Sequence, residues 1–104
     1  MSEKELIESI TAEVAEICDP SYVYLVSKKN NVRGELTTMK LCVVVDDGID
    51  PSGEEKRLLI KTDTPIPVDF IVYNISDWND YAPEDNTFAY RIENGGELLY
   101  VKGK

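Results

Sequence analysis

Histidine is absent from the 104 residues of this chain, and its absence excludes whole classes of chemistry. Without an imidazole there is no Ser-His-Asp triad, no Cys-His nucleophile pair and no histidine metal ligand. Acid–base chemistry would therefore depend on carboxylates, Lys or Tyr. The two cysteines, Cys18 and Cys42, show neither CxxC spacing nor a metal-binding pattern, so we expect buried free thiols and no disulfide.

Long hydrophobic runs are also absent. No stretch reaches the roughly 20 apolar residues that a membrane-spanning helix needs. The first residues, Met-Ser-Glu-Lys-Glu, have neither the basic start nor the apolar segment of a signal peptide. We therefore expect no contact with a membrane, a cytoplasmic location by default, and one domain over residues 1–104.

Basic residues are scarce, with 11 Lys and Arg against 20 Asp and Glu and a formal net charge of −9. Such a field repels phosphate backbones, so nucleic acid is an unfavourable partner. The local exception is a basic group of four residues, Lys28, Lys29, Arg33 and Lys40. Two interpretations of this group stay open, a solvated loop and a contact with phosphate.

The apolar pattern of the first half predicts a helix followed by two buried strands. Ser2 and Glu5 form a capping box, and Pro20 ends the helix by restricting the residue before it. Residues 22–26 and 39–45 are short, apolar and rich in β-branched side chains, as strands covered on both faces are. The polar residues 27–35 between them are predicted to form a loop.

The second half predicts a short helix opened by a second S-x-x-E box at Ser52, and a strand over 68–73. Ser76 is expected to cap a brief helix. Residues 87–94 are expected to form a last helix, which Gly95-Gly96 closes in a left-handed conformation. Residues 98–101 complete the pattern as a strand. Together these elements predict an α/β (α+β) fold, with a small mixed sheet of about four strands and flanking helices.

Asp69 is the carboxylate that stands out, because it interrupts the apolar strand 68–73. A charge in that place must face solvent, pair with another charge or bind a metal ion. Alternation puts Asp69, Ile71 and Tyr73 on one face of the strand, and the apolar Val68, Phe70 and Val72 on the other.

Several segments match, in order, the motifs of one enzyme family. They are residues 23–26, Arg33-Gly34-Glu35, 38–45, Asp69 within 67–72, and residues 92–100 with the ending Ile-x-x-Gly-x-x-Leu-Tyr. From about Tyr22 to Tyr100 the chain resembles the minimal nucleotidyltransferases of the polymerase-β-like superfamily. The resemblance implies a nucleotidyltransferase-like sheet in which two acids of one strand and a third acid, Asp69, hold Mg²⁺ against a triphosphate.

The chain departs from this pattern where the chemistry should be. Met39 and Leu41 replace both acids of the Ser-Asp-x-Asp-Leu motif, and Ser27-Lys28 replaces the phosphate-binding Gly-Ser turn. The resemblance implies that Met39, Leu41 and Asp69 cluster on one face of the sheet, at the mouth of a cleft. No cofactor is then required, although one carboxylate leaves room for Mg²⁺ held mostly through the phosphates of a nucleotide.

The resemblance therefore favours a catalytically degenerate domain that acts by binding. Its expected ligands are a nucleotide held by Ser27, Lys28, Arg33 and Lys40, or a protein, either a helical partner or a second copy. One alternative is an active metal-dependent nucleotidyltransferase whose acidic site is rearranged around Glu35 or Asp46. The other alternative is an unrelated small α/β protein-interaction domain.

Overall fold

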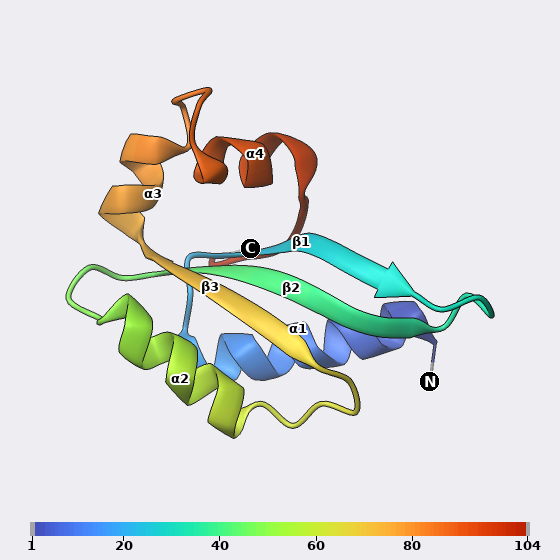
Figure 1. Cartoon of the computed structure of the whole chain (residues 1–104). Coiled ribbons are helices and arrows are strands. Elements are labelled where there is room, and N and C mark those ends of the chain that lie inside the picture. The colour runs from blue at the N-terminus through green and yellow to red at the C-terminus, as the bar shows by residue number, and fades with distance from the viewer. Residues whose placement is uncertain (1, 104) are drawn as a thin grey trace.

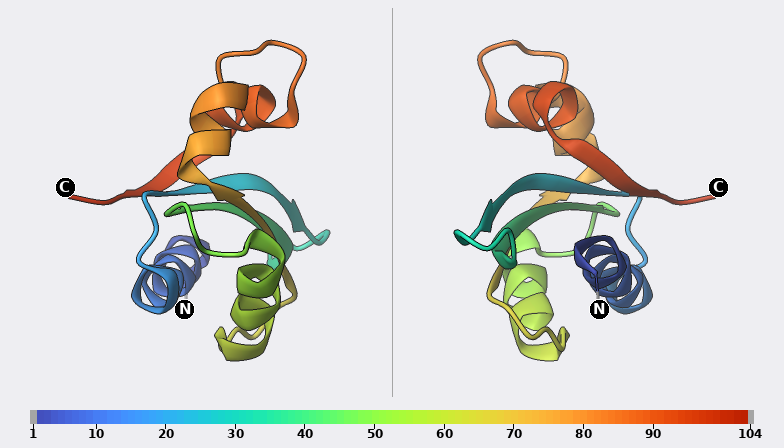
Figure 2. Two further views of the ribbon diagram at one scale, coloured as in Figure 1. Left: turned by 90° about the vertical axis from the view of Figure 1, so that its left-hand side faces the viewer. Right: turned by 90° about the vertical axis from the view of Figure 1, so that its right-hand side faces the viewer.

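A computed structural model describes residues 2–103 as a four-stranded sheet with two helices on each face (Figures 1 and 2). The predicted α/β fold class, with its mixed sheet and flanking helices, is confirmed. The elements follow one another in the order α1 (Glu3–Cys18), β1 (Tyr22–Asn30), β2 (Leu36–Val45), α2 (Pro51–Lys61), β3 (Val68–Asn74), α3 (Ile75–Tyr81), α4 (Phe88–Gly95) and β4 (Glu97–Val101).

The strands lie in the order β3-β2-β1-β4. Strand β1 is antiparallel to both of its neighbours, β2 and β4, whereas β2 and β3 are parallel. Parallel neighbours need a crossover connection, and α2 supplies it between β2 and β3. The mixed character of the sheet thus follows from one hairpin, one helical crossover and the return of the last strand to β1.

Each face of the sheet has its own apolar core. Leu41 and Val43 of β2 pack toward α1 and α2, where they meet Ile10, Val14 and Leu58. On the opposite face, beneath α3 and α4, the buried cluster consists of Tyr24, Cys42, Val44, Trp78, Ala82, Ala89 and Ile92. Figure 2 shows the two helix layers with the sheet between them. Burial on both faces explains the continuous apolar runs of β1 and β2.

Helix α1 begins as the sequence predicts. The Ser2 hydroxyl accepts a hydrogen bond from the Glu5 N–H at 3.1 Å, and Glu5 Oε1 accepts one from the Ser2 N–H at 3.3 Å. The helix ends at Cys18, and Asp19 takes a left-handed conformation with φ 47° before Pro20. The capping box and the proline therefore set both ends.

The predicted loop over 27–35 is wrong for residues 27–30, which belong to β1. Strand β1 continues to Asn30, and β2 begins at Leu36, so only residues 31–35 form the turn of a hairpin. The polar residues form strand because Lys28 pairs with Met39 and Lys29 with Thr38 across the ladder. Gly34 makes the turn possible with φ 82°, a value that favours glycine.

Three predicted caps are also corrected. Asp50, not Ser52, caps α2, since its carboxylate accepts from the Gly53 N–H at 3.2 Å and Pro51 occupies the first turn. Helix α3 begins at Ile75, so Ser76 lies inside it and its N–H donates to Asp47 Oδ1 at 3.0 Å.

The third corrected cap closes α4, whose start is set by the Thr87 hydroxyl. Gly96 ends this helix with φ −87°, in an extended and not a left-handed conformation. A side chain at Gly96 would meet the Ile92 carbonyl oxygen at 2.6 Å, so close packing explains this glycine. Among residues 2–103, no helix is both long and apolar enough to cross a membrane.

Substituting Leu41→Ala tests the position of β2. Leu41 is fully buried between the sheet and the α1–α2 layer, so the substitution removes packed methyl groups and leaves a cavity. We expect the free energy of unfolding to fall by about 2–5 kcal/mol in urea titrations. Ile60→Ala, at a side chain that is 83% exposed, is the control and should change stability by less than about 0.5 kcal/mol. Equal effects would contradict this packing.

Candidate functional site

Asp69 lies at the start of β3, on the face opposite Val68 and Phe70 and therefore on the α3–α4 side of the sheet. Figure 1 shows that β3 begins away from α3 and α4. It is in register with Lys40 on the parallel strand β2, and Lys40 pairs in turn with Ser27 of β1. Neighbouring strands lie about 4.8 Å apart, so the three side chains form a row across three strands. Lys29 and Thr38, which pair with each other two residues further along, share this face.

The expected cluster of Met39 and Leu41 with Asp69 is wrong. Met39 is in register with Val68 and Leu41 with Phe70, and both side chains belong to the core against α1 and α2. They are 3% and 0% exposed. Because side chains alternate along a strand, residues one position from Lys40 must point to the opposite face. The β2 residues nearest Asp69 on its face are Thr38 and Lys40, and Cys42 and Val44 continue that face beneath α3 and α4.

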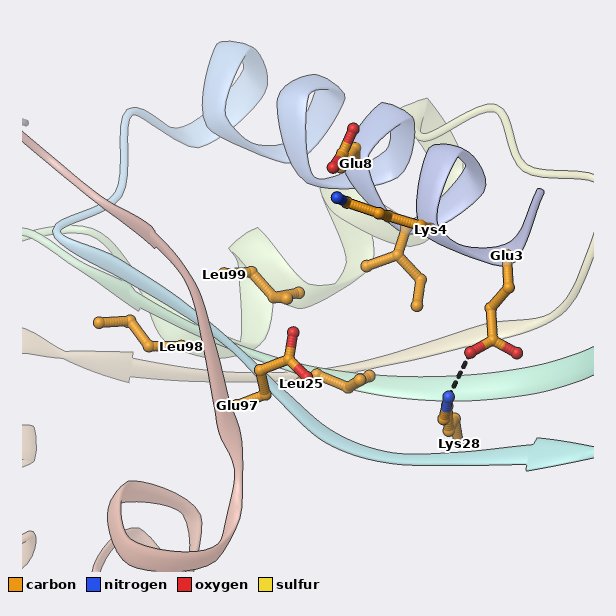
Figure 3. Close-up of a pocket in the computed structure, with 9 residues that line it drawn as sticks. Glu3, Lys4, Glu8, Leu25, Lys28, Glu97, Leu98 and Leu99 are labelled. Carbon is orange, nitrogen blue, oxygen red and sulfur yellow. Dashed lines mark hydrogen bonds and ion pairs between the residues drawn. The ribbon is translucent and has the colours of Figure 1, made fainter. Parts of the chain in front are cut away.

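Lys28 and Arg33 are not brought to this row. Lys28 pairs with Met39 and so lies on the α1 side, where its ammonium forms an ion pair with Glu3 (Figure 3). Hydrogen bonds from Lys28 and Asn30 hold the pKa of Glu3 below its usual value. Arg33 lies in the hairpin turn, where its backbone N–H donates to Asn31 Oδ1 at 2.9 Å. Of the predicted basic group, only Lys29 and Lys40 face Asp69.

A cavity of about 350 Å³ opens at this row, lined by Ser27, Lys28, Lys29, Thr38, Met39, Lys40, Pro67 and Asp69. Asp69 is the one carboxylate among these residues, beside several lysines and two hydroxyl groups. Lys29 belongs to the predicted basic group, but neither Lys29 nor Thr38 is among the ligand residues expected from the sequence. The signal that finds them is alternation counted from Lys40, once Lys40 is known to lie beside Asp69.

The acids proposed to compensate for the missing metal ligands lie far from Asp69. Glu35 and Asp46 are five and six residues from Lys40, at opposite ends of β2, which corresponds to roughly 16–20 Å along an extended strand. A Mg²⁺ ion needs its oxygen ligands within about 2.1 Å. No group of three or more Asp, Glu, Cys or His side chains in residues 2–103 could hold a metal ion.

Both cysteines are free and buried, as predicted. Burial raises the pKa of the Cys42 thiol to about 12. Burial, reinforced by the nearby Glu54 carboxylate, also raises the pKa of Cys18 to about 12. The thiolate is the reactive form of cysteine, so neither side chain is prepared for nucleophilic chemistry.

Comparisons with known proteins returned no match, whether against protein-family models, curated proteins or solved structures.

Thiol labelling tests the burial of the two cysteines. With pKa values of about 12, roughly one thiol in 10⁴ is ionised at pH 8, and each is also shielded from reagent. We expect an aromatic disulfide reagent to modify two thiols per chain rapidly in guanidinium chloride, and the native protein only at the rate of its unfolding. Rapid labelling of a protein whose circular dichroism stays native would contradict the buried placement.

Proposed function

We propose that this chain is a nucleotidyltransferase-like domain that binds an anionic ligand, a nucleotide phosphate, and does not transfer nucleotides. The observation that carries the proposal is the register of Lys40 with Asp69. On the face where the resembled family would place its carboxylates, an ammonium group stands beside the single acid. Asp69 alone offers too few oxygens for the metal-dependent reaction.

The charges at this row support an anion. With Lys28 engaged by Glu3, the groups facing the cavity are the ammonium groups of Lys29 and Lys40 and the carboxylate of Asp69. The hydroxyl groups of Ser27 and Thr38 can donate hydrogen bonds to phosphate oxygens. Lysine is a compact positive charge with three donors, so it can neutralise a phosphate directly where Mg²⁺ would otherwise be needed.

Binding by such exposed groups is expected to be modest. Lys29 and Asp69 are exposed and Lys40 is partly exposed, so solvent and salt screen each contact. Asp69 would repel a phosphate. The effect of removing its charge therefore distinguishes phosphate binding by lysines from metal-dependent catalysis. In a metal site the carboxylate is required, whereas beside a phosphate bound by lysines it weakens binding.

Nuclear magnetic resonance titration of isotope-labelled protein with ATP in the presence of EDTA tests the proposal. We expect resonances of Ser27, Lys29 and Asp69 to shift at millimolar ATP without Mg²⁺. Lys40→Gln should weaken binding about two- to fivefold, and Asp69→Asn should strengthen it by a similar factor, the size of exposed charge interactions. Lys56→Gln, an equal change of charge at an exposed residue of α2, is the control.

Two outcomes would overturn the proposal. The binding function fails if no resonance near the row shifts at millimolar ATP. Its non-catalytic character fails if the protein transfers label from a nucleotide in a Mg²⁺-dependent reaction that Asp69→Ala abolishes.

A further inference from the structure

A second cavity lies on the same face of the sheet, lined by residues from the start of β1, from α3 and from α4. Figure 1 shows α3 and α4 together on this side of the sheet. The volume of the cavity is about 410 Å³, within the roughly 300–1,000 Å³ of small-molecule sites. Its lining includes Tyr22 and Tyr24 of β1, Trp78 and Asn79 of α3, and Glu93 of α4. None of its lining residues is Lys or Arg, in contrast to the row at Asp69.

Aromatic rings form the inner wall of this cavity. The ring centroids of Tyr22 and Tyr24 are 6.1 Å apart, and those of Tyr24 and Trp78 are 5.2 Å apart. Tyr73 packs behind Trp78 with an edge contact at 5.5 Å. Tyr24 and Trp78 are buried, so packing holds their rings in fixed orientations, while Tyr22 is partly exposed. Ordered aromatic rings attract cations through their negative π faces.

The polar groups around the rings have no partners within the described part of the chain. No hydrogen bond there uses the hydroxyl groups of Tyr22 and Tyr24, the Trp78 indole N–H, the Asn79 amide or the Glu93 carboxylate. Among residues 2–103, the side-chain atom that is both buried and without a hydrogen-bond partner is Thr62 Oγ1. The unpaired polar atoms of the cavity are therefore not fully buried, and they are open to solvent or to a ligand. Several unpaired donors and one carboxylate therefore surround a single cavity.

The charge of the cavity comes from Glu93. Burial is the main cause that raises the pKa of Tyr24, and the negative charge of Glu93 is the second. The Glu93 carboxylate therefore lies near the Tyr24 phenol. A carboxylate beside aromatic rings is the combination that recognises ammonium groups in proteins. The unpaired indole N–H and the Asn79 amide add donors for a hydroxyl or carbonyl oxygen of the same ligand.

We propose that this cavity binds a small organic cation, an alkylammonium or quaternary ammonium group that also carries a hydrogen-bond acceptor. The partly exposed ring of Tyr22, backed by the buried ring of Tyr24, supplies the aromatic surface. Glu93 supplies the countercharge, and Trp78 with Asn79 the donors. The site is separate from the row at Asp69 and takes the opposite charge, so it extends the proposed function and does not depend on it.

The single tryptophan of the chain makes a direct test possible, because Trp78 lines the cavity. Choline chloride is titrated at constant ionic strength while the Trp78 emission is recorded. The neutral isostere 3,3-dimethyl-1-butanol is titrated in parallel. We expect a saturable response to choline in the millimolar range, and binding of the neutral isostere weaker by about fivefold or more.

Substitutions at Glu93 and Tyr22 test whether these side chains bind the choline that changes the Trp78 emission. Glu93→Gln and Tyr22→Leu should each weaken choline binding about two- to fivefold. Glu16→Gln makes the same change of charge on an exposed residue of α1, across the sheet, and is the matched control. Glu93 and Tyr22 are exposed or partly exposed, so both variants should keep the wild-type melting temperature within a few degrees.

Equal responses to choline and to the neutral isostere would overturn the proposal, and so would equal affinities of Glu93→Gln and Glu16→Gln. A further titration with a short peptide that contains trimethyl-lysine identifies the source of the cation. Tighter binding of the peptide than of choline would indicate a side chain of a partner protein, and the reverse order a free amino alcohol.

Discussion

The register of β2 between β1 and β3 is the constraint on which the rest of this structure depends. Five consecutive residues of β2, Leu41 to Val45, are fully buried because helices cover both faces of the sheet. A slip of one residue would exchange the two faces and carry Lys40 into the α1–α2 core. The cost of burying an unpaired ammonium group is several kcal/mol, so the core itself excludes that arrangement. The row formed by Ser27, Lys40 and Asp69 is a consequence of core packing.

Much of the fold could be predicted because its strongest signals are local or periodic. The Ser2–Glu5 capping box lies within one turn of helix, and the alternation of Val68, Phe70 and Val72 lies within one strand. The apolar runs of β1 and β2 predict strands buried on both sides without reference to any partner. Such signals are sufficient for the fold class and for the order of the elements.

The errors arise where a distant segment decides the outcome. Ser76 has the chemistry of a cap, but the Asp47 carboxylate, 29 residues earlier, engages its N–H. The polar end of β1 looks like a loop until the ladder with β2 is known. The predicted cluster of Met39 and Leu41 with Asp69 is wrong for the same reason, because it depends on the pairing of β2 with β3. An offset of one residue in a motif is invisible in the sequence, yet it decides whether Met39 or Lys40 lies beside Asp69.

The two proposals assign opposite charge preferences to two regions of one face of the sheet. A chain with a net charge of −9 attracts cations and repels anions at long range. This field would favour a cation that approaches the cavity at Glu93, and it would oppose an anion that approaches the row at Lys40. Salt screens fields over about 8–10 Å, so the local contacts of each region retain more of their strength than the field of the whole chain. For the proposed anion, the placement of Lys29 of β1 and Lys40 of β2 on one face of the sheet matters more than the net charge of the chain, which opposes a phosphate ligand.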